Sequence, residues 1–452
     1  MTRFDIEEFI DRTPIGVTQS ITLIVCAMVC FIDGFDLVLL GKIAPAIAKH
    51  FGETSAAMTP AFVYQQVGLA VGAFVISPLA DRIGRRLMLI IACLFLGIIM
   101  LASTQVQSLH MLAVMRGLAG IFMAAGLPMA MALVSELTPL RRRSTFVAVA
   151  LAGYSMGSAA SGIVAAWLLD DFGWQSGFLI GGAVPLVCLP LLLFFVPESL
   201  KFCAERNPAD VRIAGTVRRL DPNESLRGDE IFVLGSANSK GRRARLVDIF
   251  SEGRLTTTAL IWAASTLSVT NTVVLGTWLP SFFQEMAGVP IQKFAVVALI
   301  GYLGGVGGPL IVGWLMDKTR PALLLASFYV MLAISLNMLA WVPFGTPAFI
   351  VVVVCWAFFQ SGGSGGINTM MTHIYPPRMR STALGWAGGA ARVGAVIAPI
   401  AGGFALAQQF SLKLTLALEA ILPLGVALLM LALATVRRES AMITADPEPE
   451  GA

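Results

Sequence analysis

Two carboxylates stand three residues apart inside an apolar stretch near the start of the chain, VCFIDGFDLVLL at residues 29–40. At the centre of a membrane helix, Asp33 and Asp36 would each cost about 2.5–3.5 kcal/mol if they faced lipid. A spacing of three places both on one face of a helix, so that face must turn toward a cavity or a basic partner. Two carboxylates crowded in a medium of low dielectric are difficult to ionise together, so the pair could hold a proton near neutral pH. The spacing favours a proton-coupling site, and the alternative is a helix cap or an ion pair that fixes the helices.

Two arginines in other apolar stretches are the candidate counterparts of these acids. Arg116 lies in VMRGLAGIFMAAGLPMAMALVSE and Arg392 lies in GWAGGAARVGAVIAPIAGG. A guanidinium is always charged and binds a carboxylate through two parallel hydrogen bonds. One arginine could hold an anionic substrate while the other pairs with the two aspartates. Alternatively, both are internal ion-pair partners, or Arg116 lies toward the outer end of its helix and acts as a gate.

The composition indicates which elements position these residues. The chain has 452 residues, of which 57% are hydrophobic and 13% charged, against about 45–50% and 25% in a soluble domain. This excess of apolar residues predicts an all-α polytopic membrane protein. Apolar runs long enough to cross about 30 Å of hydrocarbon lie near residues 19–42, 60–80, 87–106, 109–135, 144–169, 175–196, 256–284, 291–316, 321–342, 346–374, 381–406 and 411–436.

The runs predict twelve transmembrane helices in two six-helix halves. The predicted domains are an N-terminal bundle at 1–196, a cytoplasmic linker at 197–255, and a C-terminal bundle with a short cytoplasmic tail at 256–452. The linker carries 11 basic and 9 acidic residues, which is typical of a mixed-charge segment with short amphipathic helices rather than a catalytic domain.

The distribution of basic residues predicts the orientation. Placing both termini in the cytoplasm puts 25 of the 31 Lys and Arg residues on the cytoplasmic side. Only Lys42, Lys49, Lys293 and Lys413 fall on the opposite side. The excess of cytoplasmic Lys and Arg that membrane proteins show therefore predicts a multi-pass inner-membrane protein with both termini inside.

The two halves repeat each other. LTPLRRRST at 137–145 aligns with IYPPRMRST at 374–382 at an offset of 237 residues, so Arg141 corresponds to Arg378 and Arg143 to Arg380. LADRIGRR at 79–86 has a weaker counterpart in LMDKTRP at 315–321, at an offset of 236. Two six-helix halves related by duplication are the architecture of major facilitator transporters, in which substrate binds between the halves.

The first of these loops resembles the motif G-x-x-x-D-R-x-G-R-R of the major facilitator superfamily, with Ser77 in place of the leading glycine. We interpret Asp81, Arg82, Arg85 and Arg86 as a cytoplasmic latch. In it the aspartate accepts from a helix N-terminus or an arginine, and the arginines pair with acids of neighbouring helices in one conformation only. The alternative is a solvated basic loop.

Longer stretches are similar to the aromatic acid:proton symporters, the branch with carriers for benzoate, 4-hydroxybenzoate, protocatechuate and vanillate. These stretches are DGFDLVLLGKIAPAI, DRIGRR, RGLAGIFMAAGLPMAMALVSELTPLRRRS, GGSGGIN and YPPRMRSTALGWAGGAARVGAVIAPIAGG. The resemblance implies that Asp33 and Asp36 form the coupling pair and that Arg116 and Arg392 are the intramembrane arginines. It also implies that Glu136, Asp317 and Arg380 occupy charged positions at the cytoplasmic ends.

Two departures concern the cavity. Family members often have Asn after the proline of helix four, where this chain has Met129, and a Gln in the helix-ten glycine run, where this chain has SGGSGG. We read this as a cavity with fewer hydrogen-bond donors, or more room, than that of a 4-hydroxybenzoate carrier. Tyr154, Trp386 and Asn368 are further candidate substrate contacts, although aromatic and amide side chains in a bundle more often serve packing.

The sequence predicts a proton-coupled importer of an aromatic carboxylate that works by alternating access. Its partners would be that substrate, protons and the lipid bilayer, with no nucleic acid and no second subunit. The alternative is a symporter or exporter of another organic anion on the same fold. No metal cluster, nucleotide loop or Ser/Cys–His arrangement indicates an enzyme, and we expect no cofactor. Six cysteines, five of them in apolar runs, are interpreted as small hydrophobic residues.

Overall fold

The computed structural model describes residues 2–222, 224, 226, 230–234, 249–250, 254–375 and 379–443. It divides into two units, Met1–Lys240 and Gly241–Ala452, each of which is described by itself. Arg378, one of the repeat positions, lies outside the described residues. So does much of the predicted linker 197–255, and the predicted domain boundaries stay predictions.

The described residues contain twelve spans long and apolar enough to cross a membrane, six in each unit, which confirms the predicted fold class. In unit 1 the spanning helices are α2 (Val17–His50), α3 (Thr59–Ile83), α4 (Arg85–Ser103), α5 (Leu109–Leu137), α6 (Leu140–Trp167) and α8 (Gln175–Phe194), with the short η1 (Ser55–Met58) and α7 (Leu169–Phe172) in connections. In unit 2 they are α12 (Leu255–Ala287), α13 (Ile291–Met316), α14 (Pro321–Trp341), α15 (Pro347–Ile374), α16 (Arg380–Ala407) and a last span made of α17 (Leu412–Glu419) and α18 (Ile421–Ile443).

Several helices begin where a hydroxyl side chain satisfies the first free amides. Ser108 accepts from the Met111 amide at the start of α5, and Thr346 accepts from the Phe349 amide at the start of α15. One boundary differs from the sequence prediction. Hydropathy predicts that the first span ends near residue 42, but α2 continues through Pro45 to His50. The residues after 42 are apolar until Lys49 and His50, and the proline costs only one hydrogen bond of a well-packed helix.

Glycines let α2 and α6 approach closely in unit 1. A Cβ atom on Gly157 would collide with the Phe31 carbonyl oxygen, and one on Gly153 with the Ala27 carbonyl oxygen. On α2, a Cβ on Gly34 would collide with the Tyr154 carbonyl oxygen. Small residues give membrane helices the van der Waals contact that hydrophobicity cannot supply between apolar surfaces in lipid. This contact holds the helix that carries both aspartates.

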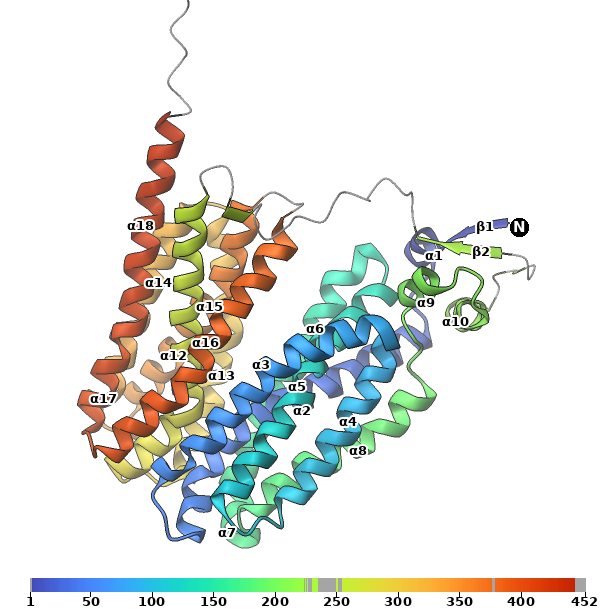
Figure 1. Ribbon diagram of the computed structural model, residues 1–452. Coiled ribbons are helices and arrows are strands. Elements are labelled where there is room, and N and C mark those ends of the chain that lie inside the picture. Colours follow the sequence, from blue (N-terminus) through green and yellow to red (C-terminus); the bar gives the residue numbers. More distant parts are fainter. Residues whose placement is uncertain are drawn as a thin grey trace, which may run out of the picture. The chain divides into compact units, whose positions relative to one another are not determined.

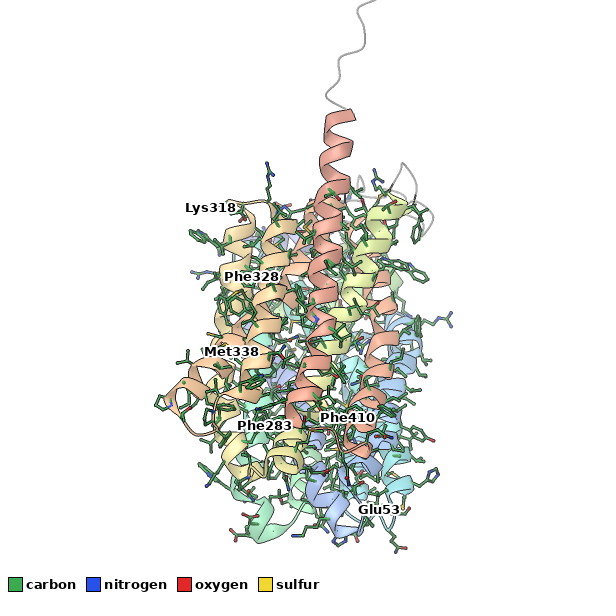
Figure 2. All side chains as sticks on the ribbon, turned by 90° about the vertical axis from the view of Figure 1, so that its left-hand side faces the viewer. Glu53, Phe283, Lys318, Phe328, Met338 and Phe410 are labelled. Carbon is green, nitrogen blue, oxygen red and sulfur yellow. The ribbon has the colours of Figure 1, made fainter. Side chains whose placement is uncertain are left out.

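Unit 2 is organised around a core to which α12, α13, α14, α15, α16 and α18 all contribute buried side chains. Two buried tyrosines use their hydroxyls inside it: Tyr329 shares a hydrogen bond of 2.6 Å with Ser268, and Tyr375 donates to Thr258 over 2.8 Å. Figure 2 shows Lys318 at one end of this unit, with Phe328 and Met338 following along α14, and Phe283 and Phe410 toward the other end. Aromatic side chains pack together in both regions, Phe328 with Phe358 and Phe359 and Phe283 with Phe294 and Phe349.

A small cap closes one end of unit 1 (Figure 1). It consists of strand β1 (Thr2–Asp5), α1 (Ile6–Arg12), α9 (Leu200–Arg206), α10 (Val211–Leu220) and strand β2 (Glu230–Val233). The two strands pair in parallel, Thr2 with Glu230 through Asp5 with Val233. Buried side chains from all of these helices and from β2 form its core with Leu137 of α5. The expected amphipathic helices of the linker are present, whereas the two-stranded sheet was not predicted.

We expect Gly157→Ala to destabilise the protein by about 1–3 kcal/mol, because the new methyl group must push α2 and α6 apart. Thermal unfolding of the purified protein in detergent measures this. Gly313→Ala on α13 is the matched control, since nothing lies within 4 Å of the position that its new methyl group would take, and alanine favours a helix. Equal unfolding temperatures for the two variants would contradict the close contact.

Candidate functional site

The centre of unit 1 is an ion pair between α2 and α5. The Arg116 guanidinium donates from Nη1 to Asp36 Oδ1 over 2.9 Å and from Nη2 to Asp36 Oδ2 over 3.0 Å. The arginine side chain is fully buried and that of the aspartate is 1% exposed. Met100 Sδ of α4 lies 3.0 Å from the same Nη1, and the Phe178 ring of α8 lies 5.8 Å from the guanidinium. Arg116 is therefore held by three neighbouring helices and is the partner of Asp36.

Asp33 lies on the same side of α2 but in a different setting. Its carboxylate packs against Gly126 of α5, where a Cβ atom would collide with the carboxylate oxygens, and it faces the backbone N–H of Leu127. The next residue, Pro128, interrupts the hydrogen-bond ladder of α5. Within the described residues, no Lys or Arg forms an ion pair with Asp33, which is 7% exposed. The predicted shared face is thus present, and its two acids are held differently.

A second buried cation, Lys42, faces away from this pair toward α6. Its Nζ donates to the Ser158 carbonyl oxygen and to Ser161 Oγ, each over 2.8 Å. Ser158 Oγ in turn donates to the Gly34 carbonyl oxygen over 3.1 Å. The position of Lys42 on the side opposite the termini stays a prediction, and its side chain is only 4% exposed. The apolar IAPAIA that follows it was the available signal of this burial.

The buried charges of unit 1 balance. In the described parts of its spans, between their charged ends, stand two acids, Asp33 and Asp36, and two bases, Lys42 and Arg116. The interior is neutral when both carboxylates are ionised and carries one positive charge when one of them binds a proton. Binding of a single proton therefore makes the interior attract an anion, because Coulomb energies are large in a medium of low dielectric.

The loop motif is organised around an acid that the motif itself does not contain. Glu198 Oε1, just beyond α8, accepts from the backbone amides of Arg85 and Arg86 over 3.0 Å each, at the N-terminus of α4. A carboxylate at this position complements the helix dipole. Asp81, expected to accept from a helix N-terminus or an arginine, is exposed, as is Arg82. Glu198 was not predicted, and the preceding Pro197 and the following Ser199 were the only sequence cues to this cap.

The two arginines of the motif are nevertheless engaged. Arg85 forms an ion pair with Glu136 of α5 and donates to Ser199 Oγ over 3.0 Å, and Ser199 Oγ also bonds Glu136. Arg86 donates to the carbonyl oxygens of Leu192 and Leu193 at the end of α8. The motif thus ties α4, α5 and α8 together within unit 1.

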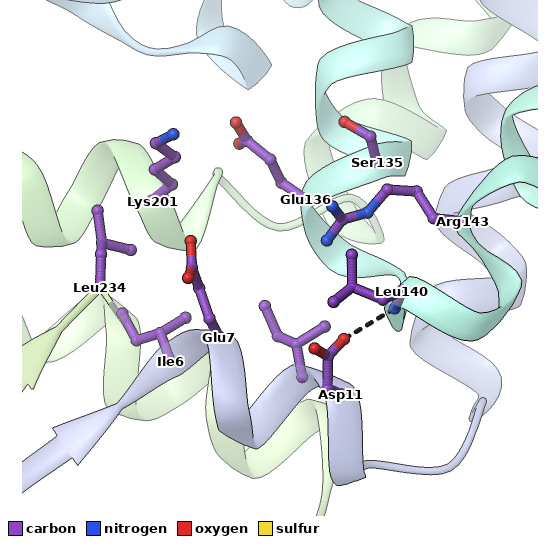
Figure 3. Close-up of a pocket in the computed structure, with 10 residues that line it drawn as sticks. Ile6, Glu7, Asp11, Ser135, Glu136, Leu140, Arg143, Lys201 and Leu234 are labelled. Atoms are coloured by element: carbon purple, nitrogen blue, oxygen red, sulfur yellow. Dashed lines mark hydrogen bonds between the residues drawn. The ribbon is translucent and has the colours of Figure 1, made fainter. Parts of the chain in front are cut away.

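Glu136 also lines a charged pocket of about 310 Å³ beneath α1 (Figure 3). Figure 3 shows Glu7, Lys201 and Arg143 around the same space, and Asp11 reaching from α1 to the start of α6. There Asp11 Oδ1 accepts from the Leu140 amide over 2.7 Å. Asp11 therefore caps the N-terminus of α6, because Pro139 at the cap position has no side-chain acceptor. This pocket lies where the spans α5 and α6 meet the cap, and its lining includes none of the buried charges Asp33, Asp36, Lys42 and Arg116.

The remaining predicted residues lie apart from that centre. Tyr154 of α6 packs its backbone carbonyl against Gly34. In unit 2, Trp386 stacks on Trp262 with ring centroids 6.5 Å apart, and it keeps 45% of its surface exposed. Arg392 is half-buried on α16. Asn368 and Asp317 are exposed, and Arg380 donates from Nε to the Tyr375 carbonyl oxygen over 3.0 Å.

Two amides of unit 2 bond to each other. Asn271 of α12 donates to Gln360 of α15 over 3.3 Å, and Gln360 donates to Thr272 over 2.6 Å. This arrangement is typical of polar contacts that hold membrane helices together.

Twelve spans in two units of six, with buried charged residues on the first span α2, are the architecture of a secondary transporter. The model of the Major Facilitator Superfamily matches residues 26–369 and 325–450. The chain belongs to this superfamily, whose members are transporters and not enzymes.

The similar proteins are carriers of aromatic acids. The chain is 31% identical to the gallate transporter of Pseudomonas putida over 95% of this chain and 94% of that protein. It is 29% identical to the 4-hydroxybenzoate transporter PcaK of Acinetobacter baylyi, over 92% of this chain and 91% of that protein. The inward-open xylose transporter XylE of Escherichia coli has the same fold, with a TM-score of 0.69 at 15% identity, covering 96% of this chain and 97% of that one. The resemblance predicted from the sequence is confirmed.

We expect the Asp36–Arg116 pair to behave as a unit in stability measurements. Asp36→Asn or Arg116→Gln alone should destabilise the protein by about 3–5 kcal/mol, because each leaves a buried charge without its partner. The double variant Asp36→Asn/Arg116→Gln should lose less than the sum of the two. The unfolding temperatures of the wild type, the two single variants and the double variant in detergent measure this coupling, together with the yield of each protein free of aggregates. Additive losses would mean that the two side chains do not interact.

Proposed function

We propose that this protein imports an aromatic carboxylate together with one or more protons across the inner membrane. The observation that carries the proposal is the unequal setting of the two aspartates: Asp36 is paired with Arg116, while Asp33 has no cation of its own among the described residues. Asp33 is then the proton site, and Asp36 and Arg116 form the fixed pair beside it. The names of the similar carriers, for gallate and 4-hydroxybenzoate, support an aromatic acid as substrate.

The proposed cycle follows from charge. When Asp33 takes a proton from outside, the interior of unit 1 gains one positive charge, because Lys42 and Arg116 then face a single carboxylate. This charge favours an incoming anion in a site of low dielectric. The anion offsets this charge, so the loaded carrier reorients with less uncompensated charge in the interior of unit 1. Loss of the proton inside releases the substrate.

We assign the substrate carboxylate to Arg392. Arg116 binds Asp36 through two donors, which makes it a fixed partner of that acid. Arg392 is half-buried on α16, the helix that also carries Trp386. A guanidinium binds a carboxylate bidentately, and an aromatic side chain offers a face for the substrate ring. Tyr154 and Asn368 are the further candidate contacts. Both termini lie in the cytoplasm in this proposal, and the protein acts as a monomer.

Removing the proton site should separate coupling from transport. Asp33→Asn is expected to abolish accumulation of labelled gallate or 4-hydroxybenzoate in proteoliposomes with an inward proton gradient. Counterflow exchange should continue, because an amide resembles the protonated acid in charge. Asp171→Asn is the control, since Asp171 is an exposed acid of the short helix α7, outside the buried set. Gradient-driven accumulation by Asp33→Asn would contradict this assignment, and wild-type uptake that ignores the gradient would contradict symport itself. Net efflux would favour an exporter.

Removing the substrate arginine should affect binding first. Arg392→Gln is expected to weaken binding of the aromatic acid by about tenfold to a hundredfold, the loss of roughly 1.5–3 kcal/mol for a charged hydrogen bond. Titration of the purified protein with benzoate, 4-hydroxybenzoate and gallate measures this directly. The esters of these acids serve as ligands without a carboxylate and should bind wild type and variant equally weakly. Unchanged affinity of the variant for the acids would exclude Arg392 as the carboxylate partner.

A further inference from the structure

A second pocket of unit 1, of about 590 Å³, lies where α4 begins and α8 ends, beside α9 and α10. The transport cycle does not use it. Its membrane-side wall is apolar and includes Leu87 and Ile90 of α4 together with Leu193 and Phe194 of α8. Phe194 is 72% exposed, so this wall continues onto the outer surface of the helices.

Three arginines also line the pocket. Arg86 comes from the start of α4, and Arg212 and Arg219 come from α10. Arg212 binds Asp210 through Nε and Nη2, with the shortest contact at 2.7 Å, and its hydrogen bonds hold the pKa of Asp210 below its usual value. Arg212 Nη1 and the whole guanidinium of Arg219 have no hydrogen-bond partner in the part of the chain that the structure describes. Both side chains line the pocket and are exposed to solvent, so these donors are available to a ligand there.

The other groups of the pocket do not cancel this charge. Glu198 is occupied by the amides at the start of α4. Burial raises the pKa of the Cys203 thiol to about 11, so the thiol is neutral at physiological pH. With Glu198 and Asp210 both ionised, the three guanidinium groups still leave one positive charge in excess.

An apolar track leads from the pocket along the membrane span. Leu87, Leu94 and Ile98 of α4 are all exposed, at spacings of seven and four, which places them on one face of the helix. Such a face is expected toward lipid. A basic recess at one end of a lipid-facing apolar stripe matches a molecule with an anionic head and a hydrocarbon tail.

We propose that this pocket binds an anionic phospholipid, with the phosphate against Arg212 and Arg219 and one acyl chain along Leu87, Leu94 and Ile98. A free phosphate would leave the apolar wall exposed to water. A zwitterionic lipid would bring its ammonium group into a recess that already holds excess positive charge. The lipid would brace α10 against α4 and α8, since it contacts all three.

The experiment is native mass spectrometry of the full-length protein in detergent, titrated with phosphatidylglycerol or phosphatidylcholine. Phosphatidylglycerol should bind in preference to phosphatidylcholine. Arg219→Gln should weaken phosphatidylglycerol binding about fivefold, the effect of one basic residue near a membrane surface, and Arg212→Gln/Arg219→Gln roughly 25-fold. Arg218→Gln is the matched control, because Arg218 is an exposed neighbour on α10 that does not line the pocket. Its affinity should equal that of the wild type.

Three results would overturn the proposal. One is undiminished binding of phosphatidylglycerol by the Arg212→Gln/Arg219→Gln variant. Another is an equal loss in Arg218→Gln, which would mean a general effect of charge rather than this pocket. The third is displacement of the lipid by glycerol phosphate at equal concentration, which would assign the site to a soluble phosphate. None of these readouts depends on transport.

Discussion

The ion pair between Asp36 and Arg116 is the constraint on which unit 1 depends. Two charges removed from water cost several kcal/mol each, and only mutual attraction with good geometry recovers that cost. The pair therefore fixes the rotation of α2 about its axis relative to α5, with α4 and α8 packed around the guanidinium. A helix fixed in this way presents Asp33 to the interrupted part of α5 and Lys42 to α6. The positions of the other buried charges follow from this one contact.

The contacts of α2 also show how neighbouring helices are selected in a membrane, where the hydrophobic effect does not drive helices together. One face of α2 is held by charge, and the face toward α6 by glycine contacts and the bonds of Lys42. Apolar side chains gain little free energy when they exchange lipid contacts for protein contacts. Polar hydrogen bonds and close backbone packing must therefore determine which helices pack together. The resulting helix has little freedom to rotate, so Asp33 keeps its position beside the Asp36–Arg116 pair.

Much of this could be predicted from the sequence, and the exceptions have physical causes. Hydropathy and length identify spans because every backbone group in lipid must be bonded within its helix. The spacing of Asp33 and Asp36 places them on one side, but which arginine pairs with them depends on depth in the membrane, which spacing does not encode. The apolar residues after Lys42 indicate its burial, but its acceptors could not be predicted because they lie 116 and 119 residues further along the chain. Strands of four residues, such as β1 and β2, carry too short a pattern to be recognised.

The parallel pairing of β1 with β2 has a consequence for how the protein is made. The chain leaves the ribosome from its N-terminus, so residues 2–5 appear first, yet their partners at 230–233 appear only after all six spans of unit 1 have been synthesised. The N-terminal segment must wait, with Ile6, Phe9 and Ile10 uncovered, until the segment after α8 arrives to cover them. Closing the cap is therefore the last step in building the first half, and it takes place as the second half begins to emerge.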